Sequence, residues 1–323
     1  YKKRGRIQSL SEGNQYCFQD GNSSCRKTSI TTSIYISLYI IFSLISVVTV
    51  FLNLLVIISI SHFKQLHTPT NLLILSLAVS DLLVGLIVIP AMTVALMEPC
   101  WVLGDYYCAL LLYITSLSET SSLGNLILIS IDRYVAVCDP LLYHLKITTS
   151  RTICCIFISW CCCIIYDVVY LKLCVNIQVP SGCYEECISI DGALLFYVFD
   201  FLISVIMPCS IIITLYLKIF LVARSQSRKI QHVSKWTATL SYVKSVQASN
   251  SEKKAAKTLS FVVFNYLFFW NPIIALFSMF SSYSLASIII SCLPLMNSFI
   301  NPIIYAFFYP WFKVTFKRIL GLK

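Results

Sequence analysis

The sequence predicts an all-α membrane protein, a seven-transmembrane helix bundle with an extracellular amino terminus and a short cytoplasmic amphipathic helix. Hydrophobic residues make up 58% of the chain and the mean hydropathy is +0.81, well above the range of soluble domains. Seven apolar runs each supply the roughly 20 residues that a helix needs to cross a bilayer. Basic residues gather on alternate connections between these runs, as they do on the cytoplasmic side of membrane proteins.

The predicted spans follow one another with little chain between them: Ile34–Ile60, Asn71–Met97, Cys108–Ile131, Thr152–Leu173, Ala193–Val222, Thr258–Ser282 and Leu285–Tyr309. We divide the chain into an amino-terminal tail over 1–32, a seven-span domain over 33–309 and a cytoplasmic helix and tail over 310–323. In this last segment basic and apolar residues are interleaved, which predicts an amphipathic helix on the membrane surface. The residues are Trp311, Phe312, Lys313, Val314, Phe316, Lys317 and Arg318.

Charge orients the bundle. Most of the 24 Lys and Arg lie in the segments that would be cytoplasmic, whereas Lys172 is the basic residue of the opposite connections. Basic residues in the amino-terminal tail oppose this orientation, but the sequon at Asn22 predicts glycosylation and hence an extracellular tail. The net charge of +10 follows from the cytoplasmic excess. Its default partner is anionic membrane lipid, and no nucleic acid is needed to explain it.

Cysteines divide by environment. Those inside the spans, such as Cys161, are most simply small apolar residues. A second group would face an oxidising compartment, so disulfides are expected, although the sequence leaves their pairing open. This outer group is Cys17, Cys25, Cys100, Cys108, Cys183 and Cys187.

Two acids stand inside apolar runs. Asp200 lies within Ala193–Met207, and Glu119 lies in the third predicted span. A buried carboxylate costs several kcal/mol unless a cation or another partner compensates it. The two acids therefore predict a membrane-buried pocket for a positively charged small molecule.

Short motifs occur in a fixed order along the spans. They are Asn53, Asp81, Asp132-Arg133-Tyr134, Trp160, Pro208, Phe269-Trp270-Asn271-Pro272 and Asn301-Pro302-Ile303-Ile304-Tyr305. With these motifs the chain resembles the class A, rhodopsin-like, G protein-coupled receptors over essentially its whole length. The run from Asn297 to Phe312 resembles the span-seven fingerprint of the trace amine-associated receptors, and the segment from Glu252 to Thr258 is also similar to that family.

The resemblance implies a function. It implies a plasma-membrane receptor that binds a small-molecule amine outside and activates a heterotrimeric G protein inside, most simply the stimulatory or olfactory-type one. A receptor for a non-amine odorant is an alternative, as is a cation transporter, although no matched interruptions of the spans favour transport. No metal site, phosphate-binding glycine loop or nucleophile constellation stands in the sequence, so we expect neither an enzyme nor a cofactor.

The resemblance also implies where the ligand sits. Amine receptors carry an aspartate on span three, but this chain has Thr115 there, and Leu295 replaces a supporting tyrosine on span seven. Asp200 stands eight residues before Pro208, or about 12 Å along an α-helix, and resembles the span-five acid of one branch of these receptors. Further pocket candidates are Trp270, Ile273, Ile274, Phe277, Phe196 and Tyr197, the last three being equally plausible as packing residues.

Two further acids bear on the pocket. Glu119 stands four residues after Thr115 and therefore on the same helix face. It is either a ligand contact or a protonated structural group. Asp167, on span four, is better explained by a structural hydrogen bond to serines and threonines of spans three or five than by ligand contact.

The remaining motifs predict a two-state switch. Arg133 needs anionic partners at the membrane boundary, which Asp132 and Glu252 can supply. Pro272 interrupts helical hydrogen bonding where span six would pivot. The resemblance implies that Tyr216 and Tyr305 restabilise Arg133 in the open state, whereas their alternative role is interfacial anchoring.

A polar network is expected deeper in the bundle. Asp81 and Asn53 should turn inward toward Asn297 and Asn301, because polar groups rarely face lipid. The resemblance places a sodium ion and waters there, and a purely structural hydrogen-bond network is the alternative. The family pattern also pairs Cys108 with Cys187, and Cys183 with either Cys17 or Cys25.

Overall fold

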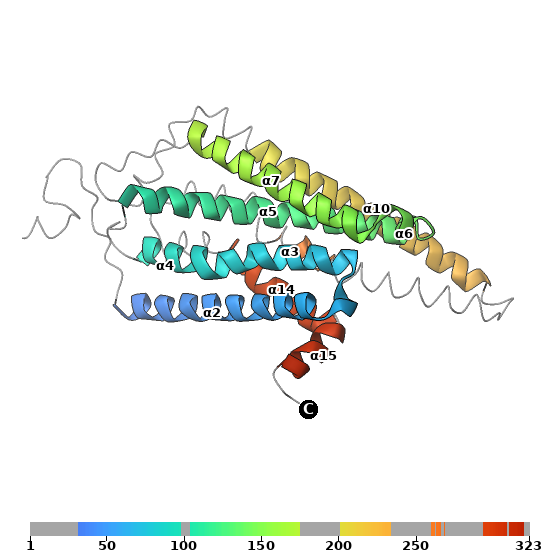
Figure 1. Ribbon diagram of the computed structural model, residues 1–323, viewed down its shortest axis with the longest axis horizontal. Helices are drawn as coiled ribbons and strands as arrows, with labels where there is room; N and C mark the ends of the chain where they lie inside the picture. The colour runs from blue at the N-terminus through green and yellow to red at the C-terminus, as the bar shows by residue number, and fades with distance from the viewer. Residues whose placement is uncertain are drawn as a thin grey trace, which may run out of the picture.

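The computed structural model describes residues 32–97, 104–174, 201–233, 260–261, 263–265, 268, 293–308 and 310–319. Every regular element among these residues is helical, which confirms the predicted all-α class. The long helices run side by side along the long axis of the molecule, whereas α15 (Pro310–Ile319) lies across it (Figure 1). Five of them are long and apolar enough to cross a membrane, and they coincide with the first five predicted spans.

The first four spans are described over their whole length. Span one is α2 (Thr32–His62), followed by the short helix η1 (Lys64–Leu66). Span two comprises α3 (Pro69–Leu83), η2 (Val84–Val88) and α4 (Ile89–Met97). Span three is α5 (Gly104–Cys138), which the short α6 (Tyr143–Lys146) joins to span four, α7 (Thr149–Cys174).

The later spans are described in part. Span five comprises η3 (Leu202–Ile206) and α10 (Met207–Val233), and span seven is represented by α14 (Met296–Phe308). The carboxy-terminal helix is α15 (Pro310–Ile319). Of the sixth predicted span, residues 260–261, 263–265 and 268 are described.

Two helices continue beyond their predicted cytoplasmic ends. The third span was expected to end at Ile131, but α5 runs to Cys138 because the polar residues that follow, Asp132 and Arg133, are paired with each other and buried. Span five was expected to end at Val222, but α10 continues to Val233. In Figure 1 the end of α10 projects past the neighbouring helices.

Two spans contain a stretch of π-helix. Each stretch ends two residues before a proline: η2 precedes Pro90 and η3 precedes Pro208. Proline cannot donate the helical hydrogen bond, and π-helical turns absorb such interruptions. The segment between Asp200 and Pro208 is therefore not a regular α-helix, and the expected rise of about 12 Å, which assumed one, does not apply.

The seventh span also departs from prediction. A continuous helix was expected over Leu285–Tyr309, but residues 293–295 form a turn and α14 begins at Met296. The turn is closed by hydrogen bonds from Met296 N to Leu293 O (3.0 Å) and from Asn297 N to Pro294 O (3.2 Å). Pro294 disfavours the helical conformation at the residue before it, so α14 begins only after the turn.

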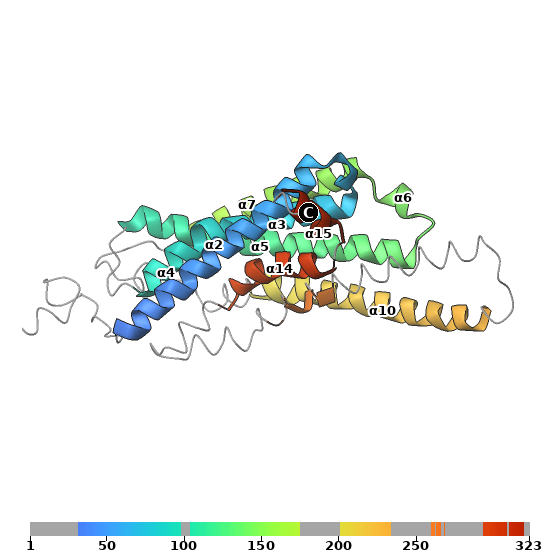
Figure 2. The same cartoon turned by 90° about the horizontal axis from the view of Figure 1, so that it is seen from below.

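Helix α5 lies at the centre of the described bundle and contacts α3, α7 and α10, an arrangement that Figure 2 shows from below. Small residues allow close approach at two places. A Cβ added to Gly85 would lie 3.0 Å from Val50 Cγ2 of α2, and one added to Gly124 would lie 2.7 Å from Ser159 Oγ of α7. Such contacts are typical of helix pairs in membranes, where lipid provides no hydrophobic drive for association.

Helix α15 packs against the bundle. Phe312 is buried in the same apolar cluster as Val56 and Ile60 of α2, and the Arg318 guanidinium lies 5.6 Å from the centre of the Phe63 ring. The predicted assignment of the whole apolar face to the membrane surface is therefore wrong for Phe312, whereas Val314 is 60% exposed and available to lipid.

Candidate functional site

The outer part of span three carries two of the predicted pocket residues. Thr115 and Glu119 are both half-buried on α5, and their spacing of four residues puts them on one face. The Thr115 hydroxyl is buried and has no hydrogen-bond partner within the described ranges. A buried hydroxyl without a partner is uncommon, and it fits a position that a polar ligand would occupy.

Most of the remaining pocket predictions lie outside the described residues. They are Asp200, Phe196, Tyr197, Trp270, Ile273, Ile274 and Phe277. Leu295 is described: it lies in the turn before α14 and is buried in an apolar cluster with Phe42 of α2 and Val88 of η2. Its surroundings are hydrocarbon, so it offers a ligand no polar contact.

Asp167 is completely buried on α7. Its two carboxylate oxygens accept hydrogen bonds from span three, one from Ser116 Oγ at 2.6 Å and one from Thr120 Oγ1 at 2.9 Å. This is the structural hydrogen bonding that the sequence favoured over direct ligand contact.

A polar network joins spans one, two and seven. Asp81 is buried and accepts hydrogen bonds from Ser298 Oγ (2.8 Å) and Asn301 Nδ2 (2.9 Å). Asn53 donates from Nδ2 to the carbonyl oxygens of Thr49 (2.9 Å) and Ser298 (3.0 Å). The predicted inward orientation of both side chains therefore holds.

Asn297 belongs to the same region and makes a contact that the sequence did not predict. Its Oδ1 accepts a hydrogen bond from Asn265 Nδ2 of the sixth predicted span at 2.9 Å. The contact ties the polar region of span seven to span six. Among the described residues no cluster of three or more His, Cys, Asp or Glu could hold a metal ion.

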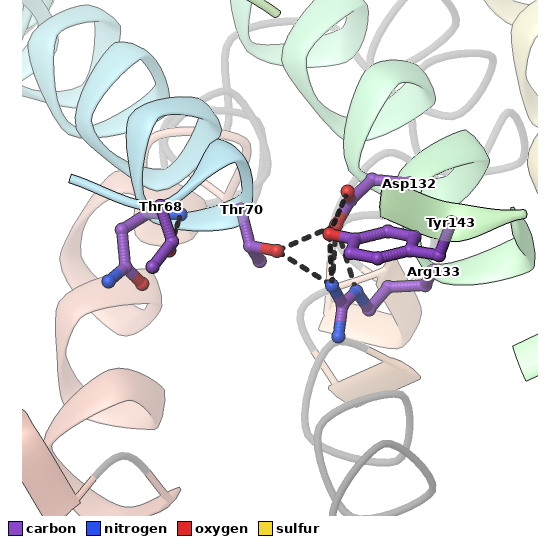
Figure 3. A network of polar contacts seen from close by, with 6 residues as sticks. Thr68, Thr70, Asp132, Arg133 and Tyr143 are labelled. Carbon is purple, nitrogen blue, oxygen red and sulfur yellow. Dashed lines mark hydrogen bonds and ion pairs between the residues drawn. The ribbon is translucent and has the colours of Figure 1, made fainter. Parts of the chain in front are cut away.

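The cytoplasmic end of span three carries a compact cluster around Arg133 (Figure 3). Arg133 donates to Asp132 Oδ2 from Nε (3.0 Å) and Nη2 (2.7 Å), and the side chains of this pair are 5% and 2% exposed. Nη2 also donates to Thr70 Oγ1 of α3 at 2.6 Å, and the same hydroxyl donates to Asp132 Oδ2 at 2.8 Å. The hydroxyl of Thr70 thus bridges the two members of the ion pair.

Tyr143 completes this cluster from α6. Its hydroxyl donates to Asp132 Oδ1 at 2.9 Å and lies 3.5 Å from Arg133 Nη2. Burial, with a contribution from the nearby Asp132 charge, raises the pKa of Tyr143 to about 12. The hydroxyl therefore keeps its proton, and its role as donor, throughout the physiological pH range.

The other predicted switch residues differ in burial, and two of them lie outside the described residues. Tyr305 is fully buried in the central apolar cluster, and Tyr216 packs against that cluster. Tyr134 is half-buried with Lys218 Nζ 5.9 Å from its ring centre. Pro302 lies inside α14, whereas Glu252 and Pro272 lie outside the described residues.

Of the predicted outer cysteines, Cys108 lies among the described residues. Cys108, at the outer end of α5, is disulfide-bonded. Its pairing with Cys187 and the bridge from Cys183 to Cys17 or Cys25 remain predictions, because those cysteines and the glycosylation sequon at Asn22 lie outside the described residues.

Sequence reasoning missed Thr70 and Tyr143. Thr70 follows the helix-start signal Thr68-Pro69, in which Thr68 Oγ1 accepts from Asn71 N at 3.3 Å. This signal places Thr70 in the first turn of a span, at the membrane boundary where Arg133 also lies. No local pattern marks Tyr143 as a partner of Asp132, because its contact depends on how the loop after α5 folds back.

Comparison with known proteins adds an independent finding. Residues 52–305 match the family described as 7 transmembrane receptor (rhodopsin family). Trace amine-associated receptor 8a of Rattus norvegicus is 39% identical over 323 residues, which cover 95% of this chain and 92% of that receptor. Trace amine-associated receptor 9 of Rattus norvegicus is 38% identical over 325 residues (96% and 94%). Trace amine-associated receptor 6 of Homo sapiens is 39% identical over 317 residues (95% and 91%).

Proposed function

Because the chain belongs to the rhodopsin family of seven-transmembrane receptors, and within it to the trace amine-associated receptors, we propose that it detects an extracellular amine. It is a multi-pass plasma-membrane receptor and not an enzyme. The proposed signal passes to a heterotrimeric G protein of the stimulatory or olfactory type and raises cyclic AMP.

The observation that carries the amine proposal is the acidic side chain of Glu119 on the pocket face of span three. Glu119 shares its helix face with Thr115, whose buried hydroxyl has no partner within the described ranges. A carboxylate in a pocket within the membrane favours a cationic ligand.

We assign the main ammonium contact to Asp200, because the resemblance to amine receptors implies an aspartate at the position where this chain has Thr115. The aliphatic residues Ile273 and Ile274 follow Trp270 in the sequence and offer no aromatic face for cation–π contact. An aliphatic amine is therefore a better fit than an aromatic catechol.

The experiment that tests this proposal is an amine panel on cells expressing the receptor, with cyclic AMP as readout. The panel contains n-alkylamines and α,ω-diaminoalkanes of graded length. Asp200→Asn keeps the shape and deletes the charge, and the loss of a desolvated charge pair, about 3 to 5 kcal/mol, should lower potency by roughly two to three orders of magnitude. Asp191→Asn, in the predicted outer loop, removes the same charge outside the pocket and should leave potency unchanged. Full potency of Asp200→Asn would refute the span-five anchor, and activation by neutral odorants alone would favour the non-amine alternative.

A second acid bears on ligand class. If Glu119 and Asp200 are both ionised they repel each other, and a diamine relieves that repulsion by binding both. We therefore expect diamines or polyamines to be preferred over monoamines. Glu119→Gln should narrow the preference by weakening diamines more than monoamines. Equal loss of both responses would contradict the two-charge arrangement while leaving the Asp200 contact standing.

A further inference from the structure

We propose that the adjacent residues Tyr166 and Asp167 of span four form a bracket that sets the relative placement of spans three and five, and thereby the length of amine that the receptor prefers. The bracket consists of Tyr166 and Asp167 with their hydrogen-bond partners Ser116, Thr120 and Ser204. This inference rests on the proposed function, because it names a specificity-determining element of the same pocket.

The first arm of the bracket holds span three. Asp167 is 0% exposed, and its two oxygens are taken by Ser116 Oγ at 2.6 Å and Thr120 Oγ1 at 2.9 Å. Ser116 and Thr120 are four residues apart, so the carboxylate spans one turn of α5 and constrains its rotation. A single contact would fix a distance, whereas two contacts one turn apart also fix an orientation.

The register of these contacts connects them to the pocket. Ser116 directly follows Thr115, and Thr120 directly follows Glu119. Consecutive residues of an α-helix are offset by about 100° around the axis. The face of α5 that Asp167 contacts is therefore adjacent to the face that carries Thr115 and Glu119. Any rotation of α5 that breaks the hydrogen bonds to Asp167 also moves Thr115 and Glu119.

The second arm holds span five. The hydroxyl of Tyr166 and Ser204 Oγ form a hydrogen bond at 2.8 Å. Ser204 lies within the π-helical stretch η3 (Leu202–Ile206), where the regular α-helical pattern is interrupted. The Tyr166 ring is stacked on Tyr170, with centroids 6.3 Å apart and planes at 14°, which restrains the position of its hydroxyl.

These two arms diverge from neighbouring positions of one helix. Tyr166 and Asp167 are consecutive residues of span four, and Tyr166 contacts span five whereas Asp167 contacts span three. The separation between the part of span three that carries Glu119 and the part of span five that carries Ser204 is then set by the bracket. A diamine that contacts both spans is sensitive to that separation.

The test measures potency across the α,ω-diaminoalkane series. One methylene in a fitted site is worth roughly tenfold or more. Two variants each break one arm of the bracket: Tyr166→Phe, and the combined Ser116→Ala and Thr120→Val. At normal surface expression, each should shift the preferred diamine length and change the potency ratio between adjacent lengths by about tenfold. Ser118→Ala is the matched control on span three, because Ser118 Oγ donates to its own helix at Ile114 O (2.7 Å). Ser210→Ala is the control on span five, since Ser210 Oγ donates to Ile206 O (2.7 Å).

Asp167 itself distinguishes positioning from direct ammonium binding. Asparagine can still accept from one hydroxyl and donate to the other, so Asp167→Asn should retain more of the length preference than Asp167→Ala. If Asp167 bound the ammonium directly, the two variants would be equally impaired and the Ser116/Thr120 variant would respond normally. An unchanged length preference in Tyr166→Phe and in the Ser116/Thr120 variant would overturn the bracket.

A second measurement needs no agonist, so it separates this inference from the amine proposal. The thiol introduced by Glu119→Cys is labelled with a charged, membrane-impermeant methanethiosulfonate reagent, and the rate for the parent receptor is subtracted. Breaking the first arm with Ser116→Ala and Thr120→Val should change that rate several-fold, whereas Ser118→Ala should not. The three receptors compared are Glu119→Cys alone, with Ser116→Ala and Thr120→Val, and with Ser118→Ala. Equal labelling rates in all three would overturn the bracket even if no amine activated the receptor. A changed labelling rate without any amine response would support the bracket and contradict the amine proposal.

Discussion

The side chain of Arg133 shows how the bundle accommodates a buried cation at its cytoplasmic end. A guanidinium removed from water costs several kcal/mol unless hydrogen bonds replace its hydration. Here Asp132 supplies the negative charge that pairs with Arg133. Thr70 of α3 bridges the two side chains, and Tyr143 of α6 donates a hydrogen bond to Asp132. The cluster therefore links span three to span two and to the following loop, and it does so through hydrogen bonds that lose their geometry if span three moves.

Removing the Tyr143 hydroxyl should weaken this resting arrangement. Tyr143→Phe deletes the bond to Asp132, and a hydrogen bond to a charged group contributes roughly 1.5 to 3 kcal/mol. We expect basal cyclic AMP to rise, with a shift of about tenfold or more in the resting equilibrium, while amine binding is retained. Because the pKa of Tyr143 is raised from 10.0 to about 12, its bond is present below that range and is lost only as pH rises through it, so the effect should be the same at every physiological pH.

The matched control is Tyr106→Phe, since Tyr106 is 93% exposed at the opposite end of α5. Basal signalling that stayed at the parent level in Tyr143→Phe, at equal surface expression, would show that this hydroxyl does not restrain the receptor.

At the scale of single residues, sequence reasoning succeeded where the partner was local or the alternatives few. The pairing of Asp132 with Arg133 follows from adjacency, and the structural bonding of Asp167 follows from its position among hydroxyl side chains. Thr70 and Tyr143 could not be assigned in this way. Thr70 reaches Asp132 from a neighbouring span and Tyr143 from the helix after the following loop, and both contacts are set by the packing of whole helices.

At the scale of elements, close contact between spans depends on residues without side chains. The carbonyl oxygen of Gly85 accepts a hydrogen bond from Ser46 Oγ of α2 at 2.8 Å, and the missing Cβ leaves room for Val50. In lipid this contact between spans one and two must come from packing and polar groups, because apolar side chains gain nothing by leaving hydrocarbon.

A larger residue should therefore separate these spans. Gly85→Val places its Cβ at 3.0 Å from Val50 Cγ2 and 3.2 Å from Val50 N, and overpacking of this kind typically costs about 1 to 3 kcal/mol. We expect a lower melting temperature of the purified receptor and a smaller amount at the cell surface. Leu86→Val is the control, since the neighbouring Leu86 is 53% exposed toward lipid. Equal melting temperatures for the two variants would contradict the role of close packing at Gly85.

The elements themselves were largely predictable, because a run of some 20 apolar residues has few alternatives to a membrane helix. Their irregularities were not. The stretches η2 and η3 reflect how the chain accommodates Pro90 and Pro208, and hydropathy does not distinguish a π-helical turn from an α-helical one. The extension of α10 to Val233 lies beyond the apolar span Leu202–Val222, so hydropathy carries no signal for its length.

At the scale of the whole molecule, polar contacts run through an apolar bundle at three depths. Asp167 joins spans three and four near the proposed pocket, Asp81 joins spans two and seven, and Asp132 joins span three to span two at the cytoplasmic end. Each is a buried network with defined geometry, and satisfied networks of this kind specify one arrangement of the helices. A transition to another arrangement must therefore break some of these hydrogen bonds.

The acid at the foot of span six provides the last prediction. Glu252 is predicted to hold Arg133 in the resting state, so Glu252→Ala should raise basal cyclic AMP. A bias of about 1.4 kcal/mol moves the equilibrium tenfold, so the loss of one charged contact at the membrane boundary is sufficient for a measurable rise. Arg133→Ala should abolish coupling while leaving amine binding intact, because Arg133 lies at the opposite end of α5 from Thr115. Lys253→Ala removes a neighbouring charge of opposite sign and serves as control. Unchanged basal signalling in Glu252→Ala, at normal surface levels, would show that Glu252 does not restrain the receptor. Asp132, Thr70 and Tyr143 alone would then hold Arg133 in the resting state. In that case the combined Tyr143→Phe and Glu252→Ala variant would signal no more than Tyr143→Phe.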